Sequence, residues 1–184
     1  MASKIKVDQI QTADGTGTIA LQNQLSGMTH ASVPTLTTGH VPTLTTGHMP
    51  AGSVLQVVTN KVTGNFSTSS QNTYVTTSQT LSITPASTSN KIMVMFGAFS
   101  VSTLAANTAI TINVRRSGTT VASGSYYTAQ QAGNHSPPFG TIHSLDSPST
   151  TSAITYEVFA AEGGVPGTVT LNGPRELTLM EIAG

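Results

Sequence analysis

The chain contains no cysteine and has few charged residues. Without cysteine it forms neither a disulfide framework nor a reactive thiolate, so its stability must come from packing or oligomerisation. Charged residues make up 8% of the sequence, against roughly a quarter in typical soluble proteins, and the formal net charge is zero. A neutral chain lacks the electrostatic footprint for nucleic acid or an anionic membrane surface. We therefore expect no nucleic-acid partner, and a surface largely covered by neighbours in a rigid assembly.

Long apolar runs are also absent. Residues 1–6, Met-Ala-Ser-Lys-Ile-Lys, lack the apolar stretch of a secretory signal peptide. No segment approaches the roughly 20 consecutive apolar residues that cross a membrane as a helix. We expect the chain to be made in a cytoplasm without insertion into a membrane.

A tandem repeat occupies residues 33–50, where Val-Pro-Thr-Leu-Thr-Thr-Gly-His occurs twice and Met-Pro follows. The repeated proline excludes a continuous helix, because each ring removes a backbone donor and clashes with the preceding turn. The segment is either a flexible linker or a shaft in which identical chains wind around one another. Regular spacing of the apolar residues favours the shaft, with these side chains buried along the common axis: Val33, Leu36, Val41 and Leu44.

Residues 1–32 contain three short elements, none of which is expected to be stable alone. Alternation over residues 4–10 predicts a strand, and a second short strand follows a glycine-rich turn. Leu21, Leu25 and Met28 then lie on one face of a helix of about two turns. Isolated helices of this length are marginal in water. The helix therefore needs a partner, which a three-chain bundle would supply.

Residues 51–184 are rich in strand patterns and nearly free of helix patterns. Runs of Val, Ile, Thr, Tyr and Phe recur between clusters of Gly, Pro, Asn and Ser. Residues 109–116 alternate between apolar and polar, whereas residues 91–101 are apolar on both faces, which is typical of a strand buried on two sides. We predict an all-β fold, an antiparallel β-sandwich or jelly roll, with strands near residues 53–59, 72–84, 91–101, 109–116, 119–128, 139–145, 153–161, 167–172 and 176–182.

Several phrases of the sequence resemble tail-fibre proteins of bacteriophages, especially phages of aquatic bacteria. The opening Lys4-Ile-Lys-Val-Asp-Gln-Ile-Gln-Thr-Ala-Asp-Gly-Thr-Gly-Thr-Ile-Ala-Leu is similar to the start of such proteins. Four further phrases are similar to parts of their globular heads: Met49-Pro-Ala-Gly-Ser-Val-Leu-Gln, Ile83-Thr-Pro-Ala-Ser-Thr-Ser-Asn-Lys-Ile, Leu145-Asp-Ser-Pro-Ser-Thr-Thr-Ser-Ala and Leu179-Met-Glu-Ile-Ala-Gly.

The resemblance implies a homotrimer in the virion, with an attachment segment at residues 1–32, the shaft at 33–50 and a β-sandwich head at 51–184. The head would bind a surface polysaccharide or an outer-membrane receptor of the host. With only two repeat units the chain is shorter than long fibres, so a non-adhesive structural, decoration or connector role at the baseplate, tail tip or head is the alternative. The attachment segment would dock on a tail or baseplate protein through apolar anchors: Ile5, Val7, Ile10 and Ile19.

Residues 125–139 form the most promising binding loop of the head. Aromatic rings stack on sugar faces, while amides and imidazoles hydrogen-bond to hydroxyl groups. One interpretation is a saccharide platform formed by Tyr126, Tyr127, His135 and Phe139. In the alternative, one tyrosine ends a strand in the core and Phe139 begins the next strand.

Two other side-chain groups suggest sites, although a structural role is favoured for each. His40 and His48 occupy equivalent positions in the repeat, so a parallel trimer would place three imidazoles at each level. Such rings could bind a transition metal, but outward-facing turn histidines are favoured and no cofactor is expected. Arg115 and Arg116 precede a Ser-Gly hairpin turn, where solvated side chains are favoured over an anion site.

Catalysis is not expected from the pattern of carboxylates. Glycoside hydrolysis needs two carboxyl groups about 5–9 Å apart across a cleft. The pattern places Asp146 in a Ser/Pro turn, Glu157 outward on a strand and Glu162 in a turn, and two more carboxylates, Glu176 and Glu181, lie near the C-terminus. The sequence also lacks a Gly-X-Ser-X-Gly elbow. We therefore expect a binding or structural protein.

Overall fold

The computed structural model describes residues 49–103, 107–127 and 140–184, and these residues form nine strands and no helix. The predicted all-β class is confirmed for this part of the chain. No described segment is a helix long and apolar enough to cross a membrane. The strands are β1 (Val54–Val62), β2 (Phe66–Thr68), β3 (Val75–Ile83), β4 (Lys91–Thr103), β5 (Thr108–Arg116), β6 (Thr119–Tyr127), β7 (Ile142–Asp146), β8 (Ile154–Gly164) and β9 (Val169–Ile182).

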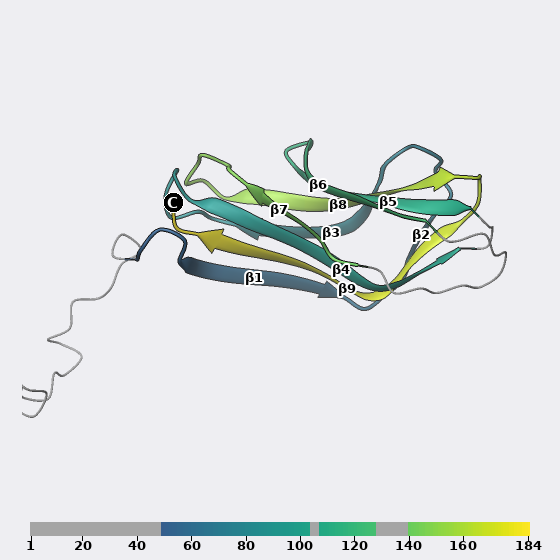
Figure 1. Ribbon diagram of the computed structural model, residues 1–184, viewed down its shortest axis with the longest axis horizontal. Coiled ribbons are helices and arrows are strands. Elements are labelled where there is room, and N and C mark those ends of the chain that lie inside the picture. Colours follow the sequence, from purple (N-terminus) through teal and green to yellow (C-terminus); the bar gives the residue numbers. More distant parts are fainter. Residues whose placement is uncertain (1–48, 104–106, 128–139) are drawn as a thin grey trace, which may run out of the picture. The chain divides into compact units, whose positions relative to one another are not determined.

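The strands pair into two antiparallel sheets that lie as two layers (Figure 1). Sheet I has the order β1-β9-β4-β7, and the short β2 pairs with the first part of β9. Sheet II has the order β3-β8-β5-β6. The two longest strands, β4 and β9, pair along their whole length in the centre of sheet I. The layers enclose one core, as in a β-sandwich.

Alternation along each strand decides which side chains enter the core. Ile110, Ile112 and Val114 of β5 are fully buried, as the period of two along a strand requires. Each such aliphatic or aromatic side chain stabilises the fold by roughly 1.5–3 kcal/mol when fully buried. The core is therefore the main source of stability, and sheet I contributes to it the fully buried residues Ile92, Val94, Phe96, Leu177 and Leu179.

Strand β9 is one continuous strand, whereas the sequence predicts two strands, 167–172 and 176–182, separated near Gly173-Pro174. Both residues are poor strand formers, but here a cis peptide bond joins them inside one continuous strand. They lie where β9 changes its neighbour from β2 to β1. The connecting turn comes so close that a Cβ atom on Gly173 would lie 2.0 Å from the carbonyl oxygen of Thr63. Close backbone approach therefore requires glycine at this position.

Two local predictions near carboxylates are wrong, and one turn is confirmed. The pattern predicts a turn at Glu162-Gly163-Gly164, but these residues complete β8 and pair with β5. Glu162 is consequently fully buried. Asp146 is the last residue of β7 and not part of a turn. The predicted hairpin turn at Ser117-Gly118 is confirmed, and both residues have positive φ angles, 48° and 82°, as a type I′ turn requires.

Candidate functional site

Of the residues predicted to bind a receptor, only the two tyrosines lie in the described ranges. Tyr126 of β6 packs, half-buried, against the core cluster, as the alternative interpretation expects, and Tyr127 is the last residue of β6. A hollow of about 120 Å³ lies beside Tyr126, between residues 124–126 and 140–142. Typical ligand pockets measure roughly 300–1,000 Å³. The platform as a whole stays a prediction, because His135 and Phe139 lie outside the described residues.

The predicted anchoring, shaft and histidine positions stay predictions for the same reason. Among the described residues, no three His, Cys, Asp or Glu side chains are placed to hold a metal ion. The positions outside the described ranges are Ile5, Val7, Ile10, Ile19, Val33, Leu36, Val41, Leu44, His40 and His48.

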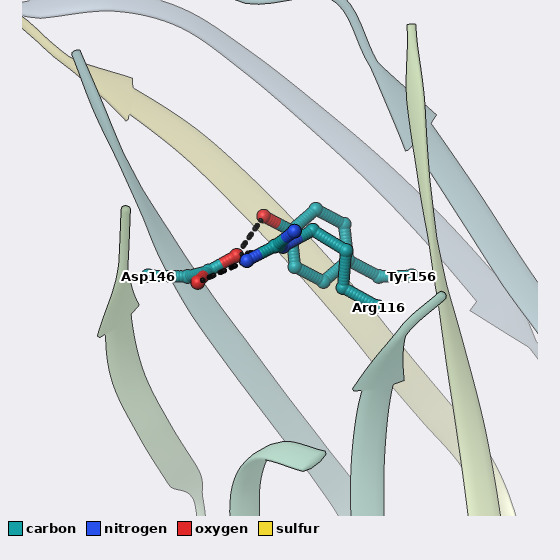
Figure 2. A network of polar contacts seen from close by, with 3 residues as sticks. All are labelled: Arg116, Asp146 and Tyr156. Carbon is teal, nitrogen blue, oxygen red and sulfur yellow. Dashed lines mark hydrogen bonds and ion pairs between the residues drawn. The ribbon is translucent and has the colours of Figure 1, made fainter. Parts of the chain in front are cut away.

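One polar cluster joins the two sheets (Figure 2). Arg116 of β5 and Tyr156 of β8 belong to sheet II, whereas Asp146 of β7 belongs to sheet I. Arg116 Nε donates to Asp146 Oδ2 at 2.5 Å and Nη2 donates to Oδ1 at 3.1 Å. The Tyr156 hydroxyl donates to the same Oδ2 at 2.7 Å. Bidentate Arg–carboxylate pairs are among the stronger polar contacts, so the solvated side chain predicted for Arg116 is instead a tie between layers.

The pKa values of this cluster follow from its geometry. Burial alone would raise the pKa of Asp146, but the hydrogen bonds from Arg116 and Tyr156 outweigh it and hold that pKa below its ordinary value. The hydrogen bond to Asp146 raises the pKa of Arg116. Burial, and then the hydrogen bond to Asp146, raises the pKa of Tyr156. At neutral pH the cluster therefore holds an ionised carboxylate and a protonated phenol, which suits a structural tie.

A second buried carboxylate, that of Glu181 in β9, accepts hydrogen bonds at both of its oxygens. Glu181 is 1% exposed. Gln56 Nε2 donates to Oε2, and Ala86 N and Asn90 Nδ2 donate to Oε1, each at 2.6 Å. Burial alone would raise the pKa of Glu181, but these hydrogen bonds bring it below its ordinary value. The side chain is therefore held as a carboxylate that fixes the segments around it.

Glu181 is the place where three phrases of the sequence meet. The donors around it come from the phrases that begin at Met49 and Ile83, and Glu181 belongs to the C-terminal phrase. Two backbone hydrogen bonds of 2.8 Å, from Gly52 N to Ala183 O and from Ala183 N to the Ser53 carbonyl, strengthen the same junction. Three of the five phrases that carry the resemblance thus meet at one structural joint of the β-sandwich.

Two further ionisable side chains are buried without an opposite charge among the described residues. Arg175 is 5% exposed; its Nε donates to Gln79 Oε1 at 3.1 Å, and its Nη1 donates to the Gly64 carbonyl at 2.5 Å. Burial lowers the pKa of Arg175. Neither carboxyl oxygen of Glu162 has a hydrogen-bond partner in the described structure. Arg175 therefore fixes neighbouring segments, whereas the burial of Glu162 opposes folding.

The outer face of sheet I carries a line of apolar side chains, which we call the apolar row. Cross-strand pairs place Val57 beside Met180, Met180 beside Met93, and Met93 beside Leu145. Val57 and Leu145 are 51% and 46% exposed, and both methionines are half-buried. Residues 91–101 are therefore buried on their inner face as predicted, whereas their outer face is partly exposed in the single chain.

The outer face of sheet II has a different chemistry. Its cross-strand pairs are mostly polar, and the ring of Phe159 together with that of Tyr74 flanks the guanidinium of Arg115. Alternation predicts that Arg115 faces outward, but it does not reveal that two rings converge on it. The pairs form two adjacent rows: Thr76, Phe159, Asn113 and Ser123, then Thr80, Glu157, Arg115 and Thr120.

The carboxylates considered for glycoside hydrolysis are dispersed. Glu157 and Glu176 lie on the outer faces of different sheets, whereas Asp146, Glu162 and Glu181 lie in the interior. A carboxyl group that acts as a general acid needs a raised pKa, and the pKa values of Asp146 and Glu181 are lowered. A non-catalytic role stays the prediction.

No protein-family model matches the chain, and the search of curated proteins found no match. A functional proposal therefore depends on the phrases of the sequence and on the contrast between the outer faces of the two sheets.

Proposed function

We propose that the chain is a bacteriophage tail-fibre protein that assembles as a homotrimer. Residues 1–32 dock on a tail or baseplate protein, and the head binds the surface of the host bacterium. The resemblance of the phrases supports the class of protein. The observation that carries the proposal is the apolar row, because a face of this kind favours a protein partner, and the repeat favours identical copies.

The composition of the row favours further copies of the same chain as its partner. The apolar row and its neighbour on one side, Thr59-Thr178-Met95-His143, contain no Asp, Glu, Lys or Arg. The row on the other side, Val54-Ile182-Lys91, carries a single charge, at Lys91. Val54, which is 50% exposed, pairs with Ile182 and extends the apolar surface at the start of β1. The three chains would then associate through the shaft and also through the apolar rows of their heads. Each Å² of apolar surface that this association removes from water stabilises the trimer by about 25 cal/mol.

Adhesion follows from this arrangement. When the outer faces of sheet I associate, the outer faces of sheet II stay exposed to ligand on each of three heads. Each head would bind weakly, but three heads per fibre and several fibres per particle raise the overall avidity, because each further contact forms at a high effective concentration. Such a fibre would act in the virion, as a tail or baseplate appendage assembled in the host cytoplasm.

A structural fibre that never contacts the host is the second candidate. The small hollow beside Tyr126 favours it, because receptor binding often uses a larger cavity. Such a fibre would act as a connector or decoration at the baseplate, tail tip or head, and it would still need the trimer.

Binding of the labelled full chain to a panel of aquatic bacteria, measured by flow cytometry, separates these candidates. The wild-type chain should bind at least one strain, and Leu145→Glu, which places a charge in the apolar row, should reduce binding at least about 10-fold through lost avidity. Thr88→Glu adds the same charge at an exposed loop position and should bind like wild type. A folded trimer that binds no strain would contradict adhesion and favour the structural fibre.

A further inference from the structure

The outer face of sheet II places one guanidinium close to two aromatic rings. The Cζ atom of Arg115 lies 4.5 Å from the ring centroid of Phe159 and 5.0 Å from that of Tyr74. Arg115 comes from β5, Phe159 from the neighbouring β8, and Tyr74 immediately precedes β3. Residues from three segments therefore confine this guanidinium. Contacts of this kind reduce the freedom that a long side chain would lose on binding a ligand.

The fixed guanidinium has no acceptor in the described chain. Its Nε is buried without a hydrogen-bond partner. The only ion pair among the described residues joins the next residue, Arg116, to Asp146. Glu157 lies directly across from Arg115 in the cross-strand register, yet the two side chains do not form an ion pair. Arg115 is therefore held in place by rings and leaves its terminal amino groups for an external acceptor.

The surroundings of Arg115 indicate which acceptor fits. A planar guanidinium matches a carboxylate through two parallel hydrogen bonds. The carboxylate of Glu157 beside it accepts hydrogen bonds from hydroxyl groups. Its negative charge also repels a ligand group that carries two negative charges, such as a phosphate dianion, more strongly than a carboxylate that carries one. The hydroxyls of Thr80 and Thr120, which occupy the same row, add partners for a polyhydroxylated ligand. These features together suit a sugar that has one carboxylate and several hydroxyl groups.

We infer that Arg115, held by Tyr74 and Phe159 and accompanied by Glu157, binds an acidic saccharide such as a uronic-acid unit of a surface polysaccharide. This inference rests on the proposed adhesive function and gives it a ligand class. The site differs from the tyrosines of the predicted platform, because Tyr126 and Tyr127 end β6, whereas Arg115 pairs with Thr120 near the start of that strand. One site of this size binds weakly, and three heads compensate through multivalency.

Saturation-transfer NMR of the full chain with trigalacturonate, and with maltotriose as the neutral probe, tests the site. Trigalacturonate should bind and maltotriose should bind at least 10-fold more weakly. Arg115→Gln should weaken trigalacturonate binding at least 10-fold. Arg115→Lys keeps the charge and the stem but loses the paired geometry, so a several-fold loss is expected from a chain that stays folded. Lys61→Gln removes an exposed positive charge from sheet I and should leave binding unchanged.

The outcomes separate this site from the proposed function. Absence of trigalacturonate binding, equal binding of the two probes, or equal affinity in wild type and both Arg115 variants would overturn the site. If Arg115→Gln still binds bacteria like wild type, the adhesive function stands and the ligand site is wrong. If trigalacturonate binds through Arg115 but no bacterium is bound, the site stands and the proposed function is wrong.

Discussion

Glu181 gives the sharpest prediction about stability, because its carboxylate is fully paired. In Glu181→Gln, an NH₂ group replaces the carboxylate oxygen Oε2, so that it faces the Nε2 donor of Gln56. The Gln56 side chain cannot turn without loss, since its Nε2 also donates to the Thr84 carbonyl at 2.7 Å. The hydrogen bond from Gln56 is therefore lost, and the two hydrogen bonds to the other oxygen no longer involve a charged acceptor. From the typical net contributions of hydrogen bonds to stability, the free energy of unfolding should fall by about 2–3 kcal/mol.

The assay is thermal unfolding followed by circular dichroism at neutral pH. For a domain of roughly 130 residues, about 2–3 kcal/mol corresponds to a decrease of roughly 8–12 °C in the midpoint. Glu176→Gln is the matched control, because it makes the same change at an exposed position of the same strand. It should change stability by less than about 0.5 kcal/mol.

The stability difference between wild type and Glu181→Gln should depend on pH. Hydrogen bonds lower the pKa of Glu181 in the folded chain below its ordinary value of 4.5. The carboxylate's contribution is therefore fully present above pH 4.5 and is lost as the pH falls through the folded pKa. Glutamine does not titrate, so the difference between wild type and Glu181→Gln should shrink at acidic pH. A difference below about 0.5 kcal/mol at neutral pH, or one that stays constant on acidification, would refute the reasoning.

Three further substitutions test other features by the same unfolding assay. Asp146→Asn removes the charge that pairs with Arg116 and should cost about 1–3 kcal/mol; no change would contradict the tie between the sheets. Glu162→Met replaces an unpaired buried carboxyl group by an apolar one of similar length and should stabilise by about 1–3 kcal/mol. Destabilisation would instead indicate a partner for that group. Gly173→Ala forces a Cβ atom against the Thr63 carbonyl and should cost more than about 2 kcal/mol; wild-type stability would contradict the close approach.

The fold could be predicted from the sequence where alternation was regular. Residues 109–116 form β5 with the predicted faces, and the Ser117-Gly118 turn closes its hairpin. The failures lie where the neighbouring segment decides the structure. Gly173 suggests a strand end by its own preference, but the β1–β2 turn needs it inside β9. The three-residue β2 carries too few residues for any periodic signal.

The candidate sites were less predictable, because they depend on contacts between distant segments. The outward direction of Arg115 follows from the period of two, whereas its two flanking rings come from β8 and from the residue before β3. The apolar row likewise needs the register of four strands before Val57 and Leu145 can be placed on one line. Glu162 looked like part of a turn because two glycines follow it, and only the pairing with β5 shows its burial.

The measurement that tests the account most directly is the native mass of the purified full chain by light scattering, over a range of concentrations. A homotrimer should have a mass close to three times the 18.9 kDa of one chain, and Leu145→Glu, but not Thr88→Glu, should shift toward single chains on dilution. A wild-type chain that remains at 18.9 kDa at every concentration would contradict the trimer, the shaft and the role assigned to the apolar row.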